Sequence, residues 1–135
     1  MVILVIDDDP ALTDLLKLML EPIYTNVVTT NNASEGIELA KRLSPDIIIL
    51  DLMMPLINGW EACQAIREFS ATPILMLSAL DNPSLVAQAL NAGADDFLVK
   101  PAASNILVAH LNKLMRRNRM EKSLDAQAAA NLHYR

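Results

Sequence analysis

The chain alternates short apolar runs with longer segments in which apolar residues recur at helical spacing. The runs predict strands at residues 2–6, 26–30, 47–50, 73–79 and 96–101. Several are unbroken stretches of Val, Ile and Leu with no polar alternation, which is typical of parallel strands buried on both faces. A charged residue or a hydroxyl stands at or next to the carboxyl end of the first, third, fourth and fifth of these runs.

The segments between the runs carry helix start and stop signals. Asp9 before Pro10 predicts one helix start, and Asn32 with Glu35 predicts a second start of the capping-box type. Further helices are predicted after the Asn-Gly turn at 58–59, over residues 83–92, and from about residue 104 well past 116. The buried faces are expected to hold Leu12, Leu15, Leu16 and Met19; Ile37, Ala40 and Leu43; Trp60, Cys63 and Ile66; and Leu107, Leu111 and Leu114.

Strands alternate with helices five times through short connections, which is the pattern of a parallel sheet covered on both faces. Because crossovers between parallel strands are right-handed, the pattern predicts an α/β, doubly wound fold.

Composition narrows the class of protein. The 135 residues suit one domain, and 53% are hydrophobic but only 4% aromatic, so the core is aliphatic. The single cysteine, Cys63, excludes an intramolecular disulfide and a thiolate metal cluster, and is expected to be a small core residue. No apolar run reaches membrane-spanning length and no signal-peptide pattern opens the chain, so a soluble, cytoplasmic protein is expected.

Charge is distributed unevenly. Residues 1–112 hold 14 acidic and 5 basic side chains, a balance of −9, whereas residues 113–135 hold 2 acidic and 6 basic ones, a balance of +4. An acidic body does not attract nucleic acid. The basic end is more typical of a solvated helix face than of a nucleic-acid site.

Polar residues stand where the buried strands end. Asp7 and Asp8 follow the first strand, Asp51 the third, Ser78 closes the fourth and Lys100 the fifth. Taken alone, Asp51 would suit a helix cap or a loop as well as it suits a functional site. The carboxyl ends of parallel strands share one edge of the sheet, where ligands bind, so the five side chains are expected to meet there.

These residue types limit the chemistry. Three carboxylates form a hard-oxygen site suited to Mg²⁺ rather than zinc. An aspartate beside Mg²⁺ can act as a nucleophile and form an acyl phosphate. Lys100 adds positive charge for in-line phosphoryl transfer, and the Ser78 hydroxyl can donate a hydrogen bond to a phosphoryl oxygen once one is present.

Taken together, these motifs closely resemble the receiver domains of two-component response regulators. The resemblance covers roughly residues 2–117 and rests on IDDDP at 6–10, DLMMP at 51–55 with Gly59, SA at 78–79 and GADDFLVKP at 93–101. It implies a flavodoxin-like (βα)₅ fold with strand order 2-1-3-4-5. Residues 1–117 would then be the receiver domain, and residues 118–135 a C-terminal helical extension or the start of a linker.

The resemblance also implies roles for the site residues. Asp51 would take a phosphoryl group from a sensor histidine kinase or a phosphotransfer protein, and the chain would catalyse only its own phosphorylation and dephosphorylation. Asp8 would bind Mg²⁺ directly, Asp7 largely through water, and Asp51 and the backbone carbonyl of Met53 would complete the metal shell.

Ser78 and Phe97 would form the switch pair by the same resemblance. When phosphate draws Ser78 inward, Phe97 would move into the vacated space and alter the face made by helix four, strand five and helix five. That face would control a partner or an output domain. The alternative is that Phe97 is an ordinary half-buried strand residue.

Two departures from the family pattern carry predictions. Met53 and Leu80 stand two residues beyond Asp51 and Ser78, where receivers often have polar residues, so a long-lived phosphorylated state is expected. Many regulators dimerise through charged pairs on the face named above. Asp95, Asp96 and Arg117 fit such a set, but Val86, Asn91, Ile106 and His110 stand where charges are expected. A homodimer would then use a more apolar contact on that face or the C-terminal helix.

Other classes of protein fit the sequence less well. A haloacid-dehalogenase-type phosphatase needs Asp-x-Asp followed by Thr or Val, but Pro10 and Ala11 follow Asp9. A flavodoxin or dinucleotide-binding module needs a glycine loop after the first strand, and none of the three glycines is near it. A non-phosphorylated interaction module on the same fold is the remaining alternative.

Overall fold

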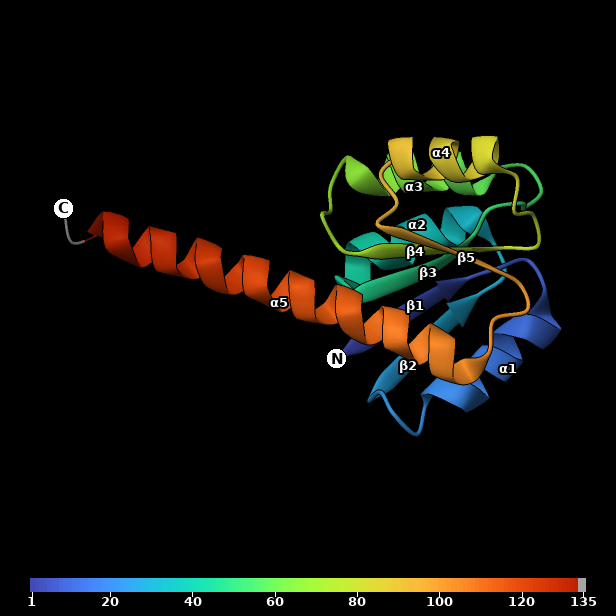
Figure 1. Cartoon of the computed structure of the whole chain (residues 1–135), viewed down its shortest axis with the longest axis horizontal. Helices are drawn as coiled ribbons and strands as arrows, with labels where there is room; N and C mark the ends of the chain where they lie inside the picture. Colours follow the sequence, from blue (N-terminus) through green and yellow to red (C-terminus); the bar gives the residue numbers. More distant parts are fainter. Residues whose placement is uncertain (134–135) are drawn as a thin grey trace.

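The computed structural model describes residues 1–133, which form a five-stranded parallel sheet between two layers of helices (Figure 1). The strand order is β2-β1-β3-β4-β5, as expected, so the predicted α/β doubly wound fold is confirmed. The strands are β1 (Val2–Ile6), β2 (Asn26–Thr30), β3 (Ile47–Asp51), β4 (Ile74–Ser78) and β5 (Asp96–Val99).

Five helices alternate with the strands. They are α1 (Pro10–Leu20), α2 (Ala33–Leu43), α3 (Gly59–Arg67), α4 (Pro83–Asn91) and α5 (Ser104–His133). The predicted caps are present: Asp9 accepts a hydrogen bond from the backbone N–H of Ala11, and Asn32 accepts one from that of Glu35. Such caps satisfy backbone donors that the first helical turn leaves free.

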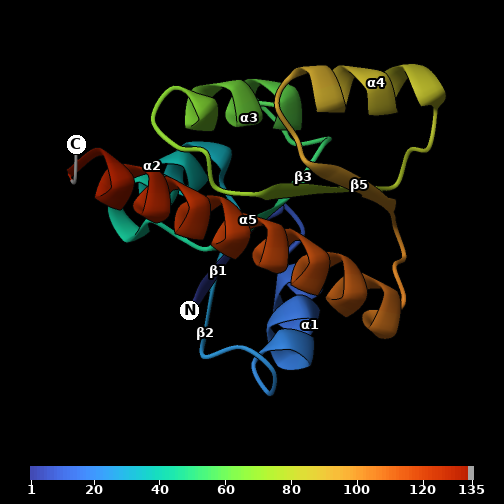
Figure 2. The same cartoon turned by 60° about the vertical axis from the view of Figure 1, so that its left-hand side comes forward.

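The sheet has a separate aliphatic core on each face. Alternate residues of a strand point to opposite faces, so Ile3 and Val5 pack toward α1 and α5, whereas Leu4 and Ile6 pack toward α2, α3 and α4. Figure 2 shows the two helix layers on either side of the sheet. Cys63 is fully buried in the second core, as predicted, and its Sγ lies 3.4 Å from the carbonyl oxygen of Ala92.

Three predicted details are wrong. Leu15 is 52% exposed and Leu43 is 37% exposed, although both were expected in the core. The buried line of α1 runs instead through Thr13, Leu16 and Leu20, and Leu43 is the last residue of α2, where the helix leaves the sheet. The fourth and fifth strands are also shorter than predicted, since Pro73 lacks a ladder N–H and Lys100 follows the last paired residue.

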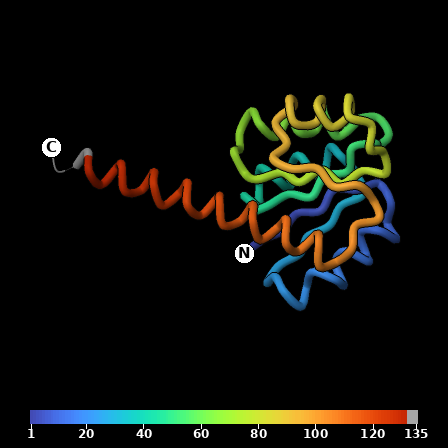
Figure 3. The backbone as a smooth tube through the Cα atoms, in the orientation of Figure 1, coloured from blue at the N-terminus to red at the C-terminus, as the bar shows by residue number. Residues whose placement is uncertain are grey.

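The helix α5 is the longest element, and it extends well beyond the domain (Figure 3). Its predicted stripe of Leu107, Leu111 and Leu114 is fully buried, but every residue from 119 to 131 is exposed. The proposed extension over residues 118–135 thus lies on this helix, except that 134–135 fall outside the described residues. Among the described helices, none combines the length and apolar character needed to cross a membrane.

Candidate functional site

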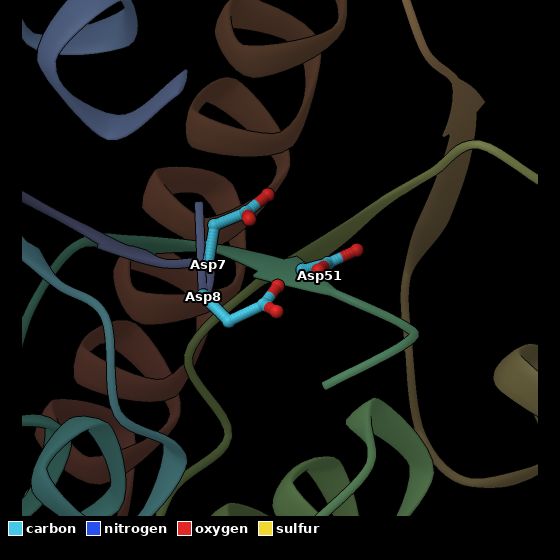
Figure 4. Close-up of side chains that lie close together, drawn as sticks. All are labelled: Asp7, Asp8 and Asp51. Carbon is cyan, nitrogen blue, oxygen red and sulfur yellow. The ribbon is translucent and has the colours of Figure 1, made fainter. Parts of the chain in front are cut away.

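Three carboxylates meet at the carboxyl edge of the sheet. Asp7 and Asp8 follow β1 and Asp51 closes β3, and because β1 and β3 are hydrogen-bonded neighbours, the two strand ends lie side by side. One carboxylate oxygen from each residue lies within 4.8 Å of the other two (Figure 4). Asp7 and Asp51 are buried, whereas Asp8 is exposed at the mouth of the cluster.

Lys100 reaches the same cluster from the end of β5. Its Nζ lies 2.7 Å from Oδ2 of Asp7 and 3.2 Å from Oδ1 of Asp51. The backbone N–H of Lys100 donates to the carbonyl oxygen of Ser78 at 2.7 Å, which anchors the residue beside the end of β4. The structure therefore brings together residues that are separated by 93 positions along the chain.

The electrostatics follow from burial and crowding. Burial, together with the nearby charge of Asp7, raises the pKa of Asp51 to about 7, although Lys100 opposes this rise. Burial lowers the pKa of the Lys100 ammonium, but hydrogen bonds and charge from Asp7 and Asp51 outweigh it and leave the pKa above its usual value. One ammonium faces three carboxylates, so the cluster retains an excess of negative charge when all three are ionised.

The donor set of this cluster fits a magnesium ion. Carboxylate oxygens are the ligands that Mg²⁺ prefers, and the excess negative charge favours a divalent cation. Met53, whose backbone carbonyl is predicted to bind the same ion, follows β3 by two residues, and its side chain is 52% exposed.

Sequence reasoning missed the residues that brace the cluster. The backbone N–H of Asp9 donates to Oδ1 of Asp7 at 3.0 Å. The amide of Asn31 donates to the backbone oxygen of Asp7 at 2.8 Å and to the hydroxyl of Thr13 at 3.0 Å. Asn31 follows β2, the strand beside β1, so its place at a strand end was the available signal.

Gly59 positions the segment that follows Asp51. A Cβ atom at Gly59 would stand 2.5 Å from the backbone oxygen of Asp51, closer than any side chain tolerates. Its N–H donates to the backbone oxygen of Leu52 at 2.7 Å. The first turn of α3 thus lies directly against the end of β3, an approach that requires glycine.

The predicted switch residues occupy neighbouring strands. Ser78 is fully buried and its Oγ accepts a hydrogen bond from the backbone N–H of Leu80 at 3.1 Å. Phe97 pairs with Met76 in the sheet and is partly buried against the core beneath α3 and α4. The two side chains are placed by adjacent strands at one end of the sheet, and their roles as a switch remain predictions.

Known proteins share both this sequence pattern and this fold. A family model for the response regulator receiver domain matches residues 3–112. The chain belongs to the response regulator receiver family. As a receiver, it is part of two-component signal transduction, and the predicted family and fold are confirmed.

Relatives and solved structures agree with this assignment. The receiver is 37% identical over 119 residues to the DNA-binding response regulator MtrA of Mycolicibacterium smegmatis, covering 88% of this chain and 52% of that protein. It is 41% identical over 118 residues to the DNA-binding dual master transcriptional regulator RpaA of Synechocystis, covering 85% of this chain and 49% of that protein. The chain thus spans about half the length of these curated relatives. A two-component response regulator from Clostridium difficile has a similar structure, with a TM-score of 0.83 at 31% identity, covering 86% of this chain and 96% of that one.

Two acidic residues at the start of β5, Asp95 just before the strand and Asp96 as its first residue, are paired within the chain. Asp95 accepts from Arg67 at 2.8 Å and from Arg117 at 2.5 Å, and also from the backbone N–H of Ile74 at 2.8 Å. Asp96 contacts Nδ1 of His110 on α5 at 2.5 Å. These carboxylates therefore already have basic partners without a second molecule.

Proposed function

We propose that this receiver takes a phosphoryl group onto Asp51 and uses it to switch the face formed by α4, β5 and α5. The observation that supports this most strongly is the arrangement of Asp51 beside two further carboxylates and the ammonium of Lys100. A nucleophile, a hard-cation site and a fixed positive charge are what in-line phosphoryl transfer requires.

In the proposed reaction, one carboxylate oxygen of Asp51 attacks the phosphorus atom of a phosphohistidine. The phosphorus–nitrogen bond breaks, and the leaving imidazole takes up a proton, so that an acyl phosphate stands on Asp51. Lys100 would exchange its contact with Asp51 for a phosphoryl oxygen, whose negative charge it stabilises. The donors in the cell would be a sensor histidine kinase or a phosphotransfer protein, in the cytoplasm.

Mg²⁺ is the cation that this proposal requires. Asp8 and Asp51 would bind it directly, Asp7 largely through water, and the backbone carbonyl of Met53 would complete the shell. When bound, the ion would supply positive charge to the equatorial phosphoryl oxygens. Asp7 is held by the backbone N–H of Asp9 and by Lys100, which suits it to an indirect contact.

Ser78 and Phe97 would report the phosphorylated state. The Ser78 hydroxyl now accepts a hydrogen bond from the N–H of Leu80, so its own proton is available for a phosphoryl oxygen. Movement of Ser78 toward that oxygen would open space that Phe97 fills, and β5 would carry the change to the α4–β5–α5 face. A partner or an output domain would read this face, whereas the acidic domain itself would not bind nucleic acid directly. A homodimer through this face or through the C-terminal helix is one form that the output would take.

The acyl phosphate is expected to be long-lived. Met53 and Leu80 are 52% and 42% exposed beside the site, and neither side chain can orient an attacking water through a hydrogen bond. The half-life is measured by the loss of the adduct mass after removal of the donor. A half-life of only seconds at neutral pH would contradict this expectation.

The test of the proposal is intact mass after incubation with acetyl phosphate and Mg²⁺, for the wild type and Asp51→Asn. One added phosphoryl group in the wild type alone is the expected result. No adduct in either protein would favour an interaction module that is not phosphorylated. An adduct in both would show that another residue is the nucleophile.

A further inference from the structure

The outer part of α5 is a helix with nothing packed against it. Every residue from 119 to 131 is exposed, and Figures 1 and 3 show this part of the helix well away from the sheet and the other helices. An isolated helix as short as residues 119–131 is marginally stable in water, and most helices in proteins are stabilised by packing of one face. The segment therefore lacks the contacts that would stabilise it in a single molecule.

One face of this segment carries a seam with the spacing of a coiled coil. Met120, Leu124, Gln127 and Asn131 follow one another at intervals of four, three and four, which is the a/d pattern. Met120 is 65% exposed and Leu124 is 62% exposed, so both large apolar side chains of the seam face solvent. Ala128 flanks the seam at the next e position, where its small side chain lets a second helix approach closely.

The two amides at the outer end of the seam favour a second copy of the same helix. Gln127 falls on a core d position and Asn131 on a core a position, and each amide has both a donor and an acceptor. An amide in the core is therefore satisfied when it lies opposite an identical amide. Asparagine at an a position favours two strands in one register, at a cost in stability.

Charges beside the seam match a parallel pair of helices. With Leu124 at an a position, Arg116 takes a g position and Glu121 the following e position, and both side chains are exposed. In a parallel two-stranded coiled coil, the g residue of one helix lies beside the e residue five positions later on the other. Arg116 would therefore face Glu121 of a second copy, once on each side of the pair.

The folded domain determines where the seam begins. Continued backwards, the same stripe reaches Arg117, where two copies would oppose two guanidinium groups. The Arg117 side chain instead lies 2.5 Å from Oδ1 of Asp95, which neutralises it and draws it toward β5. The seam thus starts at Met120, about one turn beyond this ion pair.

We propose that residues 120–131 form a parallel two-stranded coiled coil with a second copy of this chain. In this dimer Leu124 packs on Leu124, Asn131 pairs with Asn131, and Arg116 pairs with Glu121. The proposal does not depend on phosphorylation of Asp51, because its residues lie on the exposed part of α5. Since the seam is short and half of it is polar, the dimer dissociation constant is expected between about 10 µM and 1 mM.

Sedimentation equilibrium of the whole chain over a concentration series tests the association. Leu124→Gln is expected to raise the dimer dissociation constant about tenfold or more, because two leucines lose their buried contacts, whereas Lys122→Gln on the opposite face should leave it unchanged. Gln127→Leu should lower the constant about tenfold or more, because it places an apolar side chain on a core position. Its matched control is Ala126→Leu, which adds the same side chain on the outer face of the helix. Circular dichroism checks that all variants keep the same helix content at high concentration.

Chain direction and register are tested separately. Leu124→Cys should form a disulfide-linked dimer under mild oxidation, since facing core positions of a parallel pair lie within disulfide reach, whereas Lys122→Cys should not. Arg116→Glu alone should weaken the dimer, and Arg116→Glu combined with Glu121→Arg should restore it. A chain that stays monomeric at about 1 mM, or a dimer that Leu124→Gln leaves unchanged, would overturn the proposal. Absence of the Leu124→Cys cross-link in a dimer would refute the parallel arrangement.

Discussion

Replacing Asp51 with Asn should stabilise the metal-free receiver, although it removes the proposed nucleophile. Asp51 is 4% exposed and lies beside Asp7 and Asp8, so its ionised form is destabilised in the folded chain. Asparagine keeps the shape of the side chain and carries no charge. Lys100 retains its 2.7 Å contact with Asp7 in the variant.

The size of the effect follows from the pKa of Asp51, which rises from 3.8 to about 7 on folding. Each pKa unit corresponds to about 1.4 kcal/mol, so the ionised carboxylate costs at most about 4 kcal/mol, and we expect a gain of about 2–4 kcal/mol for Asp51→Asn at pH 8. The raised pKa means that the folded state holds a proton that the unfolded chain has lost. The penalty is therefore absent below about pH 4, grows as the pH rises, and is complete above about pH 7.

Urea and thermal unfolding in the presence of EDTA at pH 4, 6 and 8 measure this difference. The melting temperature of the variant should exceed that of the wild type by roughly 6–12 °C at pH 8, and the two should converge at pH 4. Asp14→Asn, which makes the same chemical change at an exposed position, should have little effect at any pH. A variant that is less stable than the wild type at pH 8, or a gain that does not change with pH, would refute the reasoning.

Three further substitutions test the site and the packing around it. Gly59→Ala should lower the free energy of unfolding in urea by about 1–3 kcal/mol, because the alanine Cβ would stand 2.5 Å from the backbone oxygen of Asp51. Unchanged stability would contradict this close approach. Arg67→Met should cost about 2–4 kcal/mol by the same measurement, because it removes the ion pair with Asp95 and the hydrogen bonds that Arg67 donates to the backbone oxygens of Thr72 and Gly93. A loss below about 1 kcal/mol would argue that these contacts do not stabilise the fold. Lys100→Met should slow phosphorylation by acetyl phosphate about a hundredfold, followed by intact mass, while the chain remains folded; an unchanged rate would remove Lys100 from the proposed reaction.

The sequence was sufficient to predict the sheet because buried parallel strands are nearly continuous apolar runs. The same runs placed Asp7, Asp51 and Lys100 at strand ends, so their meeting at one edge followed from the fold. Contacts between elements were harder to predict. Helical spacing did not distinguish Leu15, which is exposed, from Leu16, which is buried, because both lie near the same face of α1.

The bracing residues were missed for a related reason. Asn31 acts through its side-chain amide on the backbone of Asp7 and on the hydroxyl of Thr13, which are distant in sequence. Its place at the end of β2 is a local signal, but that signal alone does not separate an asparagine with this role from one in an ordinary turn. Such residues are identified only when the strands are placed side by side.

The carboxylate of Asp95 holds the long helix α5 to the rest of the domain. It joins Arg67 at the end of α3, the backbone of Ile74 on β4, and Arg117 at the point where α5 leaves the domain. From Arg117 the helix continues to His133, a length of about 24 Å at 1.5 Å per residue. A tilt of about 10° at Arg117 would displace the far end of this arm by about 4 Å. A small rearrangement of β5 would thus be amplified into a movement as large as the width of a side chain.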